Sequence, residues 1–154
     1  MSATRITLMN MDSPRMLGPG VVRVAAPPSK LSFEEVREQL YRDELDCPHI
    51  LETRFHRHLL FAHDAVQSSM RLDAPDRLIT AYMRKMMAFL LFKPTPHRIV
   101  MIGLGGGSLP KFCYRHLPET QITVIEIDAR VIALRDEFCI PKDDERFQAS
   151  QIRQ

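Results

Sequence analysis

The sequence has no hydrophobic run long enough to cross a membrane. Runs such as residues 86–92 fall far short of the roughly 20 residues that a membrane helix needs. Net charge is also small, because 21 basic and 19 acidic side chains leave a formal charge of +2. This balance gives no reason to expect a nucleic-acid partner. With 154 residues, of which 45% are hydrophobic, the chain is typical of one soluble globular domain.

Cysteine is scarce and scattered, at Cys47, Cys113 and Cys139. The count is odd and no pair has metal-ligand spacing, so we expect no disulfide framework. Reduced thiols are typical of the cytoplasm, and we predict a cytoplasmic protein. Three histidines lie closer together, but no acidic or sulfur side chain is placed to complete a ligand set with His56, His58 and His63. We therefore predict no metal site.

The N-terminal part changes texture along its length. The first 30 residues are rich in proline and glycine, which would break an amphipathic helix, so we expect a mobile leader. Ser32 and Glu35 then have the spacing of a capping box, which predicts a helix that ends near Tyr41. Over residues 49–70, short β-leaning runs alternate with polar breaks. This pattern predicts a small antiparallel β module.

A longer helix is predicted next. Asp73 can serve as its N-cap, and Pro75 suits its first turn. Apolar residues then recur at helical spacing from Leu78 to Leu90, and Pro94 stops the helix.

The most informative stretch begins at residue 98. Residues 99–102 are consecutively apolar, as in a strand that is buried on both faces of a parallel sheet. Three glycines follow at alternating positions, namely Gly103, Gly105 and Gly107. Glycine permits a positive φ and lets a ligand approach the backbone closely. The helix predicted behind this turn would present free N–H groups to that ligand.

A second buried strand is predicted over residues 121–127, and it ends in acid at Glu126 and Asp128. Glu126 lies about twenty residues past the glycine turn, where a carboxylate can accept the hydroxyl protons of a ribose. Asp128 can also cap a further helix. Together these features predict a site for an adenosyl nucleotide.

The spacing of the glycines separates the candidate ligands. The dinucleotide fingerprint G-x-G-x-x-G would need glycine at position 108, where the chain has Ser108. The observed G-x-G-x-G resembles the first motif of S-adenosylmethionine-dependent transferases. Two alternatives stay open. One is a nicotinamide or flavin site, and the other is a glycine turn that only packs the helix against the strand.

With these motifs in place, residues 48–147 resemble the spermidine synthase family, the aminopropyltransferases. The glycine turn and residues 124–128 carry the resemblance most specifically, and Gln67 and Tyr82 support it. The resemblance implies an α/β, Rossmann-like methyltransferase fold, present here as its N-terminal half and preceded by the small antiparallel β module. It also implies aminopropyl transfer from decarboxylated S-adenosylmethionine to a polyamine acceptor.

The resemblance further implies roles for single residues. Gln67 would face the methionine-derived arm of the donor, Glu126 would bind the ribose, and Tyr82 would line the amine pocket. The three glycines and Asp128 would complete the donor site. The alternative enzyme class is a small-molecule methyltransferase that uses S-adenosylmethionine. The non-enzyme alternative is a partner-dependent module.

Two positions depart from the pattern of the family. Gly106 stands where the family's turn has an aspartate that helps to hold the donor amine. Tyr82 is followed by Arg84 where the family has a glutamate. A cationic donor arm and a diamine both favour nearby carboxylates. The departures therefore concern the polyamine side of the site and leave the adenosyl side intact.

In the family, a third strand grips the adenine and a fourth carries the catalytic aspartate. Here residues 148–154 are polar, and no residue can be assigned the catalytic role. We hypothesise a truncated product or a fragment, which would be inactive. Residues 99–102 would then form a bare sheet edge, so we expect a homo-oligomer. The predicted organisation is a leader (residues 1–30), a helix with the β module (31–72) and a partial Rossmann-like nucleotide-binding domain (73–154).

Overall fold

The computed structural model describes residues 20–24, 32–42, 44, 46–62 and 65–152. The chain divides into two compact units, residues 1–72 and 73–154, and each is described by itself. None of the helices in these described ranges is both long and apolar enough to span a bilayer.

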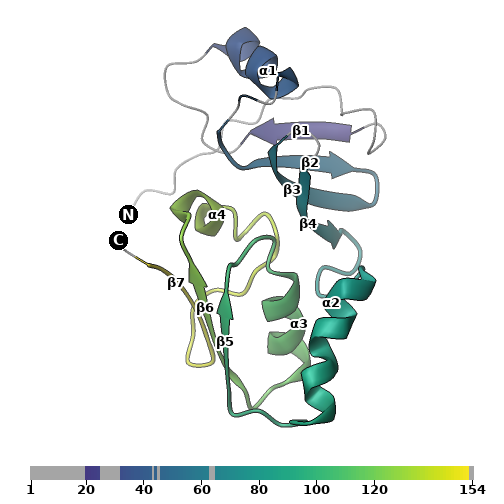
Figure 1. Ribbon diagram of the computed structural model, residues 1–154, viewed down its shortest axis with the longest axis vertical. Helices are drawn as coiled ribbons and strands as arrows, with labels where there is room; N and C mark the ends of the chain where they lie inside the picture. Colours follow the sequence, from purple (N-terminus) through teal and green to yellow (C-terminus); the bar gives the residue numbers. More distant parts are fainter. Residues whose placement is uncertain (1–19, 25–31, 43, 45, 63–64, 153–154) are drawn as a thin grey trace. The chain divides into compact units, whose positions relative to one another are not determined.

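The first unit is built on a four-stranded antiparallel sheet in the order β1-β2-β3-β4 (Figure 1). Its strands are Gly20–Val24 (β1), His49–Thr53 (β2), His56–Ala62 (β3) and Ala65–Arg71 (β4). The predicted β module is thus confirmed over β2, β3 and β4. Its buried apolar side chains include Ile50, Leu51, Leu59 and Leu60.

Helix α1 (Phe33–Tyr41) begins at the predicted capping box. The Ser32 backbone N–H donates to the Glu35 carboxylate at 2.7 Å, and the Glu35 N–H donates to Ser32 Oγ at 3.4 Å. The hydrogen bond from the Ser32 backbone lowers the pKa of Glu35. These reciprocal bonds satisfy two donors at the start of the helix that would otherwise have no intrahelical partner.

Strand β1 lies inside the stretch predicted to be a mobile leader. It pairs antiparallel with β2, from Gly20 opposite Thr53 to Val24 opposite His49. The leader prediction is therefore corrected for residues 20–24, and its other residues lie outside the described ranges. The physical reason is the β-branched run G-V-V-R-V, which favours an extended strand wherever a sheet edge can accept it.

The second unit holds a three-stranded parallel sheet in the order β5-β6-β7 (Figure 1). Its strands are Arg98–Ile102 (β5), Gln121–Glu126 (β6) and Phe147–Gln151 (β7). Its helices are Ala81–Met86 (α2), the 3₁₀ helix Met87–Leu91 (η1), Ser108–His116 (α3) and Ala129–Ala133 (α4). This confirms the predicted α/β fold class with an antiparallel module before it.

The helix predicted from Asp73 starts later than expected. Its N-cap is Thr80, whose side chain accepts from the Met83 N–H at 3.2 Å. Before it, the Arg77 N–H donates to the Ala74 carbonyl at 3.1 Å, which closes a turn in place of a helix. The predicted cap at Asp73 is therefore wrong, and the cap at Thr80 was not anticipated from the sequence.

Strand β7 lies in the polar C-terminal stretch in which the sequence analysis recognised no strand. Phe147 is fully buried and Ala149 half-buried, while Gln148 and Ser150 are exposed. This alternation has the period of a strand with one covered face. The hydroxyl of Tyr114 donates to Asp144 at 2.5 Å, and Asp144 in turn accepts from the Phe147 N–H at 2.7 Å, which fixes the start of the strand.

Burial separates the three thiols of the chain. Cys47 and Cys113 are buried, whereas Cys139 is exposed. Burial raises the pKa of the Cys113 thiol to about 11, which keeps it neutral at physiological pH. Cys113 shares the core of the second unit with Val124, Phe138 and Phe147, all of which are fully buried.

One histidine of the first unit makes stability depend on pH. His58 Nδ1 lies 2.7 Å from Ser69 Oγ, and burial lowers the pKa of His58, with the nearby His56 adding to the effect. The unfolded chain therefore binds a proton more readily than the folded one, so this contribution to stability is present above about pH 6.5 and is lost below it.

Urea unfolding at about pH 7 and about pH 5 should show that the free energy of unfolding depends less on pH in His58→Gln than in the wild type. The exposed-site control His97→Gln should keep the wild-type pH dependence of the free energy of unfolding. The same pH dependence in His58→Gln as in the wild type would contradict the role of His58.

Candidate functional site

The glycine turn occupies residues 103–107, between β5 and α3. Gly103, Gly105 and Gly107 all have positive φ, at 86°, 51° and 65°. The Gly103 N–H donates to the Ile125 carbonyl at 2.8 Å, so the turn stays attached to β6. Gly107 is the N-cap of α3 and has the left-handed conformation that L side chains rarely adopt.

Two of these glycines are required for different reasons. A Cβ on Gly107 would lie 2.4 Å from Ile140 Cγ1, so this glycine lets α3 begin tightly against the segment after α4. A Cβ on Gly103 would meet no atom within 4 Å. The turn therefore packs the start of α3 against Ile140, and at Gly103 it leaves open space beside the backbone.

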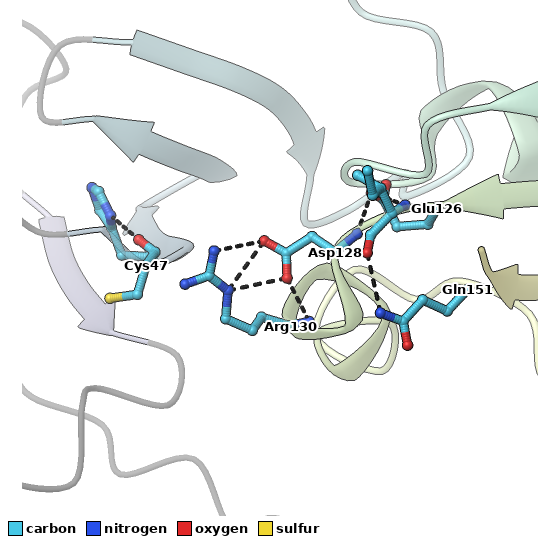
Figure 2. A network of polar contacts seen from close by, with 7 residues as sticks. Cys47, Glu126, Asp128, Arg130 and Gln151 are labelled. Carbon is cyan, nitrogen blue, oxygen red and sulfur yellow. Dashed lines mark hydrogen bonds and ion pairs between the residues drawn. The ribbon is translucent and has the colours of Figure 1, made fainter. Parts of the chain in front are cut away.

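Glu126 is the last residue of β6, and its side chain contacts the glycine turn. It is only 7% exposed, and its carboxylate accepts three backbone hydrogen bonds. Figure 2 shows the bond from Asp128. Oε2 accepts from the Leu104 N–H at 2.7 Å, inside the glycine turn. Oε1 accepts from the N–H groups of Ile127 and Asp128 at 2.8 and 2.9 Å. One side chain thus joins the end of β6 to the turn that follows β5.

This arrangement leaves Glu126 able to accept a further bond. A carboxylate has about four lone-pair sites, and backbone donors occupy three of them. The same donors fix the orientation of the group, since each hydrogen bond comes from backbone that the fold holds in place. The result is a pre-oriented acceptor beside the open space at Gly103.

The Asp128 carboxylate bonds to groups of the protein, namely the backbone and the side chain of Arg130. Its carboxylate caps α4 by accepting from the Arg130 N–H at 2.8 Å, and it also pairs with the Arg130 guanidinium (Figure 2). Arg130 Nε lies 3.0 and 3.1 Å from the two carboxylate oxygens, and Nη2 lies 2.9 Å from one of them. The hydrogen bond from the Arg130 side chain lowers the pKa of Asp128. The capping role is as predicted, whereas the sequence did not indicate the pairing with Arg130.

The end of β7 also contacts the loop after β6. Gln151 Nε2 donates to the Ile127 carbonyl at 3.2 Å (Figure 2). The Ile152 N–H donates to the Glu126 carbonyl at 3.1 Å. Sequence reasoning missed these contacts because it did not recognise β7. Asp143 pairs with Arg135 at 3.0 Å and so supports the loop before this strand.

A buried lysine, also missed from the sequence, ties α3 to the segment after α4. Lys111 is 4% exposed, and its Nζ donates to the Phe138 carbonyl at 2.7 Å. Nothing in the local sequence around Lys111 indicated this contact, because Phe138 is distant in the sequence. It holds α3 close to Ile140, the residue that packs against Gly107.

The other predicted site residues belong to other elements of the chain. Gln67 is exposed on β4 of the first unit, and Tyr82 is 69% exposed on α2 of the second. Their roles toward a donor or an amine stay predictions. His56 and His58 share one face of β3, and across the described ranges no group of three or more histidine, cysteine or acidic side chains could hold a metal ion.

The fold and the glycine turn indicate a class of protein. A parallel sheet, a glycine turn that opens a helix and a buried acid at the end of the next strand are typical of nucleotide-binding α/β proteins. A probable spermidine synthase from Corynebacterium glutamicum shares this fold, with a TM-score of 0.56 and 20% identity over 69% of this chain and 42% of that one.

Sequence relatives then narrow the class. The polyamine aminopropyltransferase of Neisseria meningitidis serogroup A is 44% identical over 94 residues, which are 60% of this chain and 36% of the relative. The enzyme of the same name from Chromobacterium violaceum is 40% identical over 93 residues. The resemblance to the spermidine synthase family is thereby confirmed. The chain spans about a third of the length of these relatives, and no model of a protein family matches it.

The contact between Gly107 and Ile140 gives a direct test of the turn. Gly107→Ala should lower the free energy of unfolding by about 1–3 kcal/mol because the added methyl overpacks against Ile140, in addition to a positive-φ penalty of about 1–2 kcal/mol. Gly103→Ala, which meets no atom, should cost only the positive-φ penalty of about 1–2 kcal/mol. In an Ile140→Ala background the cost of Gly107→Ala should fall, as urea unfolding can measure. Equal costs in both backgrounds would contradict the packing role.

Proposed function

We propose that this chain binds the adenosyl part of an S-adenosylmethionine-type donor, within a transferase of the aminopropyltransferase kind. The observation that carries the proposal is the buried Glu126 carboxylate, which three backbone N–H groups orient beside the open backbone at Gly103. A ribose hydroxyl is a donor that the remaining acceptor site of Glu126 suits.

The donor would lie against the carboxyl ends of β5 and β6. Ligands of open α/β sheets bind at this end of the strands, where the glycine turn lets them approach the backbone. The N–H groups at the start of α3 add a partial positive charge there. Asp128 would act by holding Ile127 and the start of α4 in position, since Arg130 already pairs with its carboxylate.

Sequence similarity to polyamine aminopropyltransferases over 94 residues supports decarboxylated S-adenosylmethionine as the donor and a polyamine as the acceptor. In this proposal Gln67 faces the donor arm and Tyr82 the amine. No described residue is assigned as the general base that the attacking amine needs. We therefore expect the 154-residue chain, in the cytoplasm, to bind the donor without transferring the aminopropyl group.

A second candidate function is methyl transfer from S-adenosylmethionine. It is favoured by one observation, which is 38% identity over 48 residues to the mouse eEF1A lysine and N-terminal methyltransferase, covering 31% of this chain and 7% of that protein. The two candidates share the adenosyl site and differ in the arm of the donor.

Methylthioadenosine, which carries the adenosyl part alone, tests the shared site. Calorimetry should show binding to the wild type that weakens about tenfold or more in Glu126→Gln, because hydrogen bonds to charged groups contribute about 1.5–3 kcal/mol. The exposed-site control Glu119→Gln should bind as the wild type does. Undiminished binding in Glu126→Gln would reject the assigned site.

Glu126 also anchors the turn, so thermal unfolding of each variant has to accompany the titrations. Gly103→Ala provides a second route to the same question. Its methyl enters the space where no protein atom lies within 4 Å, so it should weaken methylthioadenosine binding while the fold persists. Unchanged affinity in this variant would place the ligand elsewhere.

The arm of the donor separates the two candidate functions. We expect decarboxylated S-adenosylmethionine to bind about tenfold more tightly than S-adenosylmethionine, because a carboxylate without a paired cation loses hydration on binding. Competition against methylthioadenosine would measure the ratio. The reverse order of affinity would favour methyl transfer.

A further inference from the structure

The two oxygens of the Glu126 carboxylate are not equivalent. Oε1 accepts from two backbone N–H groups, those of Ile127 and Asp128, at 2.8 and 2.9 Å. Oε2 accepts from one, that of Leu104, at 2.7 Å. A carboxylate oxygen has two lone pairs, so Oε1 is filled and Oε2 has one acceptor position left. That position is on the oxygen that contacts the glycine turn, next to the open backbone at Gly103.

The end of β7 holds both donors of Oε1 in place. The peptide group that carries the Ile127 N–H also carries the Glu126 carbonyl, which accepts from the Ile152 N–H at 3.1 Å. The peptide group that carries the Asp128 N–H also carries the Ile127 carbonyl, which accepts from Gln151 Nε2 at 3.2 Å (Figure 2). Each peptide group is thus bonded through its N–H and through its carbonyl, so neither can turn away from Oε1 without disturbing a second hydrogen bond.

A ligand hydroxyl would gain little by displacing one of these donors. The exchange would break the hydrogen bond at Oε1 and the one to β7, and it would form one new bond in return. It would also leave a backbone N–H without a partner beside a carboxylate that is only 7% exposed. A buried donor without a partner costs about as much as a hydrogen bond to a charged group contributes. Oε1 therefore keeps its backbone donors when a ligand binds.

We propose that Glu126 accepts a hydrogen bond from one hydroxyl of the ribose and not from both. This inference rests on the proposed function, because it concerns how the adenosyl ligand is held in that site. The two hydroxyls of a ribose lie on adjacent carbons, and a carboxylate with both oxygens open can accept from both of them. Here one hydroxyl donates to Oε2, and the other finds no acceptor on Glu126 and stays hydrogen-bonded to water.

The number of open acceptor positions defines the class of ligand. The site takes adenosyl compounds that keep the hydroxyl bound to Oε2, and it accepts changes at the other hydroxyl. A nucleoside that lacks this second hydroxyl, or that carries a methyl group on it, belongs to the same class of ligand as methylthioadenosine. A carboxylate that held both hydroxyls would be weakened by either change.

Calorimetry of the full chain with methylthioadenosine and with its 2′-deoxy and 3′-deoxy analogues tests the inference. One analogue should bind within about twofold of the parent compound. The other should bind about tenfold or more weakly, because it loses a hydrogen bond to a charged group. The corresponding O-methyl compounds keep the oxygen and lose only the proton. A methyl group on the tolerated hydroxyl should change the affinity by about threefold or less, since that hydroxyl faces water.

These comparisons separate failure of the inference from failure of the proposed function. Tenfold weaker binding of both deoxy analogues would contradict the single contact and leave the adenosyl site standing. Equal affinity of all three nucleosides would reject the ribose contact itself, and with it the assigned site. Binding abolished by a methyl group on the tolerated hydroxyl would also overturn the inference, because that hydroxyl would then face the protein.

A variant of Glu126 identifies the partner of the bound hydroxyl. In Glu126→Gln the affinity difference between methylthioadenosine and the sensitive deoxy analogue should shrink to about threefold or less, because a neutral amide makes a weaker hydrogen bond. The exposed-site control Glu119→Gln should keep the wild-type difference. An undiminished difference in Glu126→Gln would assign the hydroxyl to another group and refute the inference. The comparison of nucleosides on the wild type needs no variant, so it decides the question even where Glu126→Gln fails to fold.

Discussion

The second unit depends on the hydrogen bonds of one buried carboxylate. Glu126 accepts from the N–H groups of Leu104, Ile127 and Asp128, and so joins the glycine turn to the loop after β6. A buried carboxylate without such donors would carry a large desolvation penalty. The contacts that satisfy the charge also orient it, and the acceptor site that they leave free is the basis of the proposed ribose contact. The local structure around the glycine turn and the proposed ribose contact thus rest on the same group.

Around this group, each element contributes a local constraint. Gly107 allows α3 to begin against Ile140, and Lys111 holds the same helix to the Phe138 carbonyl. Beyond the site, the sheet is covered on one face and open along β5 on the other.

Local signals predicted much of this arrangement. The capping box at Ser32, the strands β5 and β6 and the cap at Asp128 all follow from spacing of three residues or fewer or from continuous apolar runs. Three features were not predicted. Thr80, and not Asp73, caps α2; β1 formed in a proline-rich region because β2 offered an edge; and β7 alternates polar with apolar residues, so its buried side was overlooked. The two strands depend on partner strands that are distant in the sequence, whereas the Thr80 cap is a local contact.

The proposed contact between Glu126 and a ribose can be observed at the backbone donors themselves. Titrating ¹⁵N-labelled chain with methylthioadenosine should shift the amide resonances of Leu104, Ile127 and Asp128 together with that of Gly103, because a fourth hydrogen bond to the carboxylate polarises the three that it already accepts. The shifts should saturate along one binding curve. A titration that leaves these four amides unmoved while others respond would contradict the account.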